Sequence, residues 1–187
     1  MGKVYPRIDT RLREFIEAQH LFFVATAPAG SGGHLNLSPK GLESLAVLGE
    51  LEVAYLDFTG SGAETIAHLR ENGRIILMFC SLEGPPKIVR LHGRGEVIEP
   101  GDSQFQAIRD ELPEHEMPVR SVIRVAVERI SDSCGYGVPR YGYEEDRTTL
   151  TDWAAAKGAG AIEAYQQAHN LHSIDGLPAL RSPDKRD

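Results

Sequence analysis

The chain has few cysteines: its 187 residues include only Cys80 and Cys134, which lie far apart and have no second cysteine or histidine at metal-ligand spacing beside them. This argues against a disulfide framework and a structural zinc site. The sequence also lacks an apolar run near the length of about twenty residues that a membrane-spanning helix needs, and its N-terminus lacks the apolar core of a signal peptide. We therefore expect a cytoplasmic protein that has no membrane partner.

Basic residues are fewer than acidic ones, with 20 Lys and Arg against 27 Asp and Glu and a formal net charge of −7. Because no segment carries a basic run, nucleic acid is not an expected partner. The ordinary apolar fraction and the length predict one globular domain over residues 1–187, with a core at about 10–130 and a C-terminal helical extension at about 145–180.

Hydrophobic spacing predicts strands that outnumber helices in the core. The first two strands should form a hairpin across a glycine-rich turn. The fourth is apolar enough to be buried on both faces, and Gly93 and Gly95 in the fifth are candidate bulge positions. The predicted strands are 21–26, 34–38, 53–58, 74–80, 87–99 and 121–130, and the predicted helices are 11–19, 64–71, 103–112 and most of 147–170.

This order predicts an α+β fold, a mostly antiparallel barrel with flanking helices. The competing architecture is a dinucleotide-binding α/β sheet, because Gly60 and Gly62 imitate the glycine fingerprint of that fold. The imitation ends at Thr65, where close helix packing requires Gly or Ala, and the alternation of strand and helix stops after Cys80. The barrel is therefore the preferred prediction.

The junction of the third strand with the second helix is a candidate phosphate site. Residues 53–58 are strand-like and apolar, and the small residues Gly60, Ser61 and Gly62 follow where the helix should begin. Free N–H groups at a helix start attract anions, and glycines let a ligand approach the backbone. The structural alternative is a capping box, in which Ser61 and Glu64 satisfy the same N–H groups internally. Spacing alone leaves both interpretations open.

Four motifs follow one another along the chain. They are Leu37-Ser38-Pro39-Lys40-Gly41, Tyr55-Leu56-Asp57 with Thr59-Gly60-Ser61-Gly62, His68-Leu69-Arg70-Glu71-Asn72-Gly73-Arg74, and Arg90-Leu91-His92-Gly93-Arg94-Gly95. Their order resembles the pyridoxamine 5′-phosphate oxidase-like family of FMN-binding split barrels. The resemblance covers roughly residues 10–130, and a closing segment from residue 133 to 139 and from 170 to 178 is similar to a tail in an uncharacterised subgroup.

The resemblance implies an FMN site. A flavin phosphate needs cations and hydroxyls, and its ring needs an apolar wall. Lys40 and Ser38 would supply charge and a hydroxyl, although a solvated turn is the structural alternative; Lys87 and Arg90 would lie on the strand beneath the cofactor, although outward-facing charges are equally compatible. The predicted cofactor-binding residues are Ser38, Lys40, Asp57, Phe58, Thr59, Gly60, Ser61, Thr65, Lys87 and Arg90.

The sequence departs from the family at the phosphate site. Members that oxidise pyridoxamine phosphate carry a basic pair where this chain has Ala63 and Glu64, and their C-terminal substrate segment has no counterpart near Trp153. We therefore do not predict vitamin B6 oxidation. Relatives of the barrel also bind deazaflavin or haem, so the fold does not settle the cofactor.

Two functions remain open. One is an FMN-dependent oxidoreductase of unknown substrate, in which the flavin supplies the hydride chemistry. The other is a non-enzymatic flavin, deazaflavin or haem binding module. The family resemblance further implies a homodimer, across which Tyr136 would reach. No metal site is expected, since His169 and His172 lack a third ligand at useful spacing, and no catalytic residue stands out.

Overall fold

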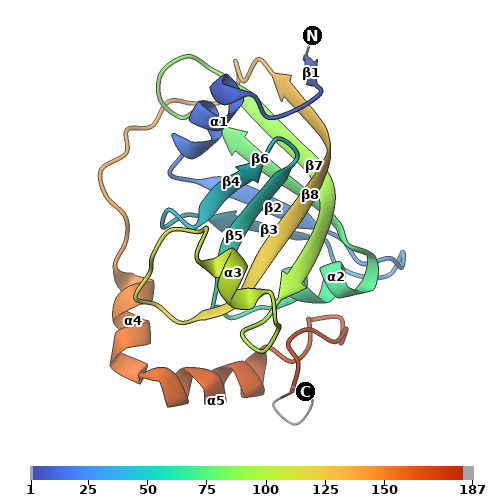
Figure 1. Cartoon of the computed structure of the whole chain (residues 1–187), viewed down its shortest axis with the longest axis vertical. Helices are drawn as coiled ribbons and strands as arrows, with labels where there is room; N and C mark the ends of the chain where they lie inside the picture. The colour runs from blue at the N-terminus through green and yellow to red at the C-terminus, as the bar shows by residue number, and fades with distance from the viewer. Residues whose placement is uncertain (1, 183–187) are drawn as a thin grey trace.

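The core of the molecule is one curved antiparallel sheet of eight strands, within residues 2–182, which the computed structural model describes (Figure 1). Each pairing between neighbouring strands is antiparallel, and the sheet does not close, because β3 and β4 remain its two edges. This confirms the predicted α+β fold and split barrel. The strand order is β3 (Asn36–Lys40), β2 (Phe22–Thr26), β6 (Arg74–Cys80), β7 (Ile88–Ile98), β8 (Val119–Ser133), β5 (Glu52–Phe58) and β4 (Leu45–Gly49), with β1 (Val4–Tyr5) paired to β8.

The helices flank the barrel, and their ends follow local sequence signals. The carboxylate of Asp9 accepts a hydrogen bond from the Leu12 amide at 2.9 Å, so Asp9 is the N-cap of α1. Helix α2 ends at Gly73, whose φ of 69° is left-handed. None of the helices in residues 2–182 has the length and hydrophobicity needed to cross a membrane. The helices are α1 (Thr10–Glu17), α2 (Glu64–Asn72), α3 (Phe105–Arg109), α4 (Thr149–Lys157) and α5 (Ala159–His169).

Several predicted boundaries were wrong. The sequence patterns did not predict β1 or β4. The predicted range was too short for β8 and too long for α3. The predicted C-terminal helix is two helices, because Gly158 takes a φ of 72° between them. Strand β6 alternates buried and half-buried positions and is not fully buried on both faces. Its apolar residues therefore cover two unequal surfaces, the barrel interior and a shallower outer layer.

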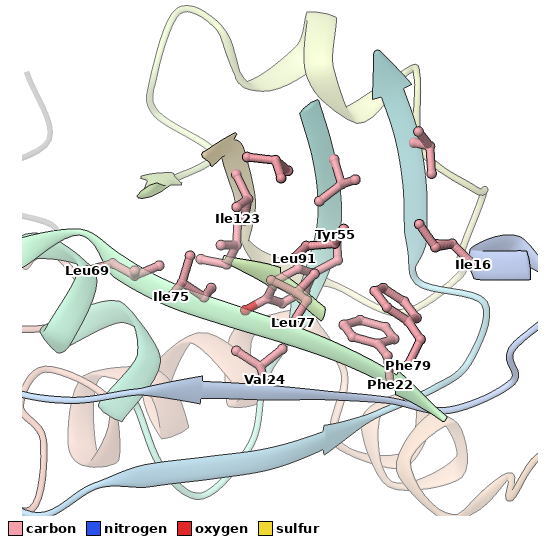
Figure 2. Packing of buried hydrophobic residues seen from close by; sticks show 14 of the residues in the cluster. Ile16, Phe22, Val24, Tyr55, Leu69, Ile75, Leu77, Phe79, Leu91 and Ile123 are labelled. Atoms are coloured by element: carbon pink, nitrogen blue, oxygen red, sulfur yellow. The ribbon is translucent and has the colours of Figure 1, made fainter. Parts of the chain in front are cut away.

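Aromatic and branched side chains fill the barrel interior. Figure 2 shows Phe22 beside Phe79, with Tyr55 and Leu77 close to them. The ring centroids of Phe22 and Tyr55 are 5.5 Å apart in an edge-on arrangement, and those of Phe22 and Phe79 are 5.7 Å apart. Tyr55 and Leu77 are fully buried. Burial of each such side chain stabilises the fold by about 1.5–3 kcal/mol relative to exposure.

Gly93, one of the two candidate bulge positions in β7, lies at a register shift, but the extra residue is on β8. His92 pairs with Arg129 and Gly93 with Val127, so Glu128 of β8 has no partner in the register. A Cβ on Gly93 would lie 2.1 Å from the carbonyl oxygen of Ala126 on β8. Only glycine lets the two backbones approach this closely, so the bend of the barrel depends on it.

Candidate functional site

The loop between β5 and α2, residues 59–63, is held by the C-terminal part of the chain. The hydroxyl oxygen of Thr59 accepts a hydrogen bond from the Gln166 amide at 2.7 Å, and the carbonyl oxygen of Gly60 accepts one from the Asn170 side chain at 3.1 Å. The Gly62 carbonyl accepts one from Arg120 at 2.8 Å. This predicted phosphate loop therefore already has partners from α5, from the segment after it and from β8.

The start of α2 carries a carboxylate where a phosphate was considered. Ala63 is the N-cap and makes no side-chain cap bond, so the capping box of Ser61 with Glu64 does not form. Instead, Glu64 folds back over Gly62, where a Cβ would lie 2.2 Å from its Oε2, and its Oε1 accepts from the Ile174 amide at 3.2 Å. A negative side chain at this place opposes an anionic ligand. Ser61 itself is exposed.

Asp57 is the centre of a buried ion cluster. Its carboxylate accepts from Arg120 Nε at 2.6 Å and Nη2 at 3.3 Å, from Lys40 Nζ at 3.3 Å and from the Ser121 hydroxyl at 3.2 Å. Burial raises the pKa of Asp57, but the Arg120 guanidinium and the Lys40 ammonium outweigh this effect and lower the pKa from 3.8 to about 2. Asp57 is therefore ionised and holds two cations in place.

Arg120 is the member of this cluster that sequence reasoning missed. It is buried, and besides Asp57 it donates to the Asn170 side chain at 3.0 Å. A signal was present: Arg120 lies near the start of β8 and Asp57 near the end of β5, each within a buried part of its strand. Charges in such positions are retained in cores when they pair.

Ser38 and Thr65 belong to a polar network beside this cluster. The Ser38 hydroxyl donates to Asn36 Oδ1 at 3.0 Å, and Asn36 Nδ2 donates to the hydroxyl oxygens of Thr65 at 2.9 Å and Thr26 at 3.1 Å. Thr26 also contacts His68 Nδ1 at 2.9 Å. Burial lowers the pKa of His68, so this side chain is neutral at pH 7. The network extends from the half-exposed Ser38 into the core.

Lys87 and Arg90 contact other parts of the chain than the Asp57 cluster and the loop after β5. The Lys87 ammonium lies 4.8 Å from the ring centroid of Phe15 and 5.9 Å from that of Tyr5. Arg90 Nη1 donates to the Ser133 hydroxyl at 2.9 Å. These contacts tie β7 to α1, β1 and the end of β8. The structure thus separates nine of the ten predicted residues into an Asp57 cluster, a polar network, a loop and this pair, while the tenth, Phe58, packs in a separate apolar cluster.

The barrel also borders an open cavity of about 950 Å³ with a mostly apolar wall. Figure 1 shows the segment between β8 and α4 running down one side of the barrel, and part of this segment forms the outer wall. None of the ten predicted residues lines the cavity. Phe58 packs against the same small core of Met117, Ala154 and Ile162 as Leu42, Leu150 and Trp153, which do line the cavity. The cavity volume lies within the range of about 300–1,000 Å³ typical of ligand sites.

The outer wall is fastened to the barrel by specific contacts. The ring of Tyr143 stacks on His20, with 3.7 Å between centroids and 11° between planes. The Tyr143 amide donates to Glu83 Oε1 at 2.8 Å, and the Tyr141 amide donates to the Leu82 carbonyl at 3.0 Å. The cavity therefore has a defined wall on the solvent side.

The two cysteines differ in setting. Cys80 lies at the end of β6 and lines the cavity, whereas Cys134 is exposed; both are free thiols. Burial raises the pKa of the Cys80 thiol, which keeps it protonated and a poor nucleophile at pH 7. Within residues 2–182 no group of His, Cys, Asp and Glu is arranged to hold a metal ion; His169 packs instead on the ring of Tyr165.

Comparison with known proteins identifies the family. The sequence profile of the pyridoxamine 5′-phosphate oxidase family matches residues 8–134. This chain belongs to the pyridoxamine 5′-phosphate oxidase family. It is 40% identical to the pyridoxamine 5′-phosphate oxidase family protein ustO of Aspergillus flavus, over 95% of this chain and 78% of that protein. The resemblance seen in the sequence is thereby confirmed.

Solved structures agree with this family fold. A HupZ variant from Group A Streptococcus is 25% identical and has a TM-score of 0.52, covering 67% of this chain and 99% of that chain. A protein from Lactobacillus delbrueckii, 20% identical, has a TM-score of 0.53 and covers 68% of this chain and 98% of that one. The matched shares agree with a common split barrel, to which this chain adds further residues.

The residues of this family member fit a flavin phosphate at one of the two predicted places. The start of α2 does not fit, because the Glu64 carboxylate covers Gly62 and the C-terminal segment is hydrogen-bonded to the loop and to Glu64. Lys40 and Ser38 do fit in charge and in hydrogen-bond type. Lys40 keeps 21% of its side chain exposed and directs one of its three donors to Asp57. With Arg120, the cluster carries one net positive charge.

Proposed function

We propose that this protein binds FMN and is a flavin-dependent oxidoreductase. The observation that carries the proposal is the match of residues 8–134 to the pyridoxamine 5′-phosphate oxidase family. Two features of the chain support it: the cationic cluster at Lys40, and an apolar cavity that is large enough for a small organic ligand. Vitamin B6 oxidation is not part of this proposal, because Ala63 and Glu64 stand where the members that oxidise pyridoxamine phosphate carry a basic pair.

In this proposal Lys40 and Ser38 hold the FMN phosphate. The half-buried ammonium of Lys40 neutralises part of the phosphate charge, and the Ser38 hydroxyl, which donates to Asn36 in this structure, turns to donate to the phosphate. Asp57 keeps Lys40 in position and lies too deep to meet the ligand itself, since it is fully buried. Bound flavin supplies hydride transfer, while the protein orients the ring and excludes water from one of its faces. Phe58 offers an apolar surface for that ring.

The first test is a cofactor titration. The purified protein is examined for a flavin spectrum, and colourless protein is titrated with FMN while flavin fluorescence is followed. We expect stoichiometric quenching. A Soret band in the purified protein would assign haem instead. Absence of binding to FMN and haem would leave deazaflavin or a non-enzymatic role and would refute the proposal as stated.

A substitution at Lys40 tests the anchor. Loss of one charge-assisted hydrogen bond to phosphate should weaken FMN binding about ten- to a hundredfold in Lys40→Met. Lys3→Met is the matched control, because Lys3 lies over the Tyr5 ring, outside this cluster. Lys87→Met separates the two predicted cation groups: an unchanged dissociation constant would place Lys87 outside the site. Equal affinities of Lys40→Met and wild type would rule out the Lys40 anchor.

We also propose a homodimer. Strand β3 is an edge of the sheet, and its outward side presents Leu37, 67% exposed, next to Leu35, 83% exposed. Exposed leucines at the edge of a sheet form an apolar surface for contact with a second copy of the chain. Light scattering should give twice the chain mass for wild type and a monomer for Leu37→Glu. A monomeric wild type would refute the dimer.

The two free thiols are typical of a reducing compartment, which supports a cytoplasmic location that cell fractionation can test.

A further inference from the structure

The large cavity has the wall of a binding site for a flat organic molecule. Its lining includes the rings of Tyr141, Tyr143 and Trp153, which come from the segment after β8 and from α4, and Leu42 from the end of β3. Aromatic and apolar walls of this kind hold rings by dispersion and stacking. The wall contains one cation among Lys and Arg, Arg147, against three carboxylates, so it offers a phosphate less than the Lys40 cluster does.

The backbone at the cavity is held in an unusual conformation. Leu42 has a φ of 58° and Glu43 a φ of 47°, both in the left-handed region that favours glycine. These are the two non-glycine residues with positive φ in the part of the chain that the structure describes. Leu42 lines the cavity. Strained residues of this kind cluster where a fold positions side chains for a ligand.

The charged groups around the cavity are mostly negative. Glu83, Glu145 and Asp146 line it, against a single arginine, Arg147. Glu83 is fixed by the Tyr143 amide at 2.8 Å, and Asp146 is half-buried. Carboxylates beside aromatic rings attract an organic cation, which gains both ion pairing and cation–π contact. The same carboxylates repel a phosphate or a carboxylate ligand.

We propose that this cavity is the substrate site and that the substrate is a ring-bearing molecule with a protonated amine and without a phosphate. The role as a substrate site rests on the proposed flavin function; the ligand chemistry rests on the cavity alone. Lys40 and Ser38 take the anionic cofactor, whereas the rings and carboxylates of the cavity take the cationic substrate. The two sites are neighbours along the chain, because Gly41 and Leu42, which line the cavity, directly follow Lys40.

The chain carries two reporters for this cavity. Trp153 is the only tryptophan in the sequence, and Cys80 becomes the only thiol in Cys134→Ser. Both residues line the cavity. Phenethylamine and hydrocinnamate share a phenyl ring and differ in the sign of their charge. We therefore titrate flavin-free protein with each probe and follow Trp153 fluorescence in the wild type and protection of Cys80 from a maleimide in Cys134→Ser.

We expect phenethylamine to act at an about tenfold lower concentration than hydrocinnamate in both measurements. The double variant Glu145→Gln, Asp146→Asn should lose this preference. The exposed Glu111, which follows α3 outside the cavity lining, provides the matched control Glu111→Gln, which should keep it. If the double variant does not fold, the comparison of the two probes on wild-type protein decides alone.

Three results would overturn the inference. Equal or stronger action of hydrocinnamate would contradict the cationic substrate. A Cys80 that does not react before any ligand is added, even at a pH high enough to ionise its thiol, would mean that the cavity is closed. Protection of Cys80 by FMN would assign the cavity to the flavin and leave the proposed function intact. Conversely, failure of the FMN titration with protection by phenethylamine would refute the proposed function and support an amine site in its own right.

Discussion

Replacement of Arg120 by methionine tests how the ion cluster beneath the candidate cofactor site is held. Arg120 donates two hydrogen bonds to Asp57, one to Gly62 and one to Asn170. Methionine keeps part of the side-chain volume and removes all four. Asp57 then remains fully buried with Lys40 as its remaining cation, at 3.3 Å.

The expected cost follows from the charge that is left behind. Removal of one partner of a buried ion pair destabilises proteins by about 3–5 kcal/mol, since the other charge stays desolvated. Because Lys40 still faces Asp57, we place Arg120→Met at the lower end, about 3 kcal/mol. Addition of Asp57→Asn to Arg120→Met should recover at least about 1 kcal/mol, because no ionised group is then stranded.

Urea unfolding followed by circular dichroism measures these free energies. Arg124→Met is the matched control: Arg124 lies on the same strand β8 but pairs with Glu96 and Glu52 at the surface, with 33% of its side chain exposed. Its loss should cost about 0–1 kcal/mol. If Arg120→Met costs no more than Arg124→Met, the cluster does not stabilise the fold as described.

Two further predictions concern pH and backbone packing. The folded-state pKa of Asp57, about 2, lies below its ordinary value of 3.8, so its contribution is present above pH 3.8 and is lost as pH falls toward 2. Acid titration of unfolding should show a loss of about 2 kcal/mol in this range that Asp57→Asn lacks, and identical profiles would contradict the pKa shift. Gly93→Ala should lower the free energy of unfolding by at least about 2 kcal/mol, because the added Cβ would meet the β8 backbone at 2.1 Å. The control Gly137→Ala, whose Cβ would have no atom within 4 Å, should change it by less than about 0.5 kcal/mol. Equal melting temperatures of the two variants would contradict the close approach at Gly93.

Local patterns predicted most of the strands correctly. The hairpin of β2 and β3, the strand β6 and the register shift at Gly93 follow from short-range alternation and from glycines, because these signals act within a few residues. Strand β4 was missed because half-buried residues with one buried centre show little alternation. The break between α4 and α5 was missed although Gly158 marks it, since a single glycine in a helical pattern is a weak signal.

For the site, the sequence predicted the residue types better than their roles. Lys40 and Ser38 offer the cation and the hydroxyl that the sequence led us to expect, and Glu64, which replaces part of the basic pair, lies over Gly62 at the start of α2. Asp57 was expected beside a flavin ring, but it is fully buried between two cations. Its distance of 63 residues from Arg120 hid this pairing from any local pattern.

The sequence by itself determined the antiparallel split barrel and the family, because periodicity and motif order are properties of neighbouring residues. Only the tertiary structure decided which predicted residues meet. The C-terminal segment occupies the loop after β5, Arg120 joins Asp57, and the segment after β8 encloses an aromatic, acidic cavity. Each of these features joins residues that are distant in sequence, and such contacts are selected by packing and charge pairing in the folded chain.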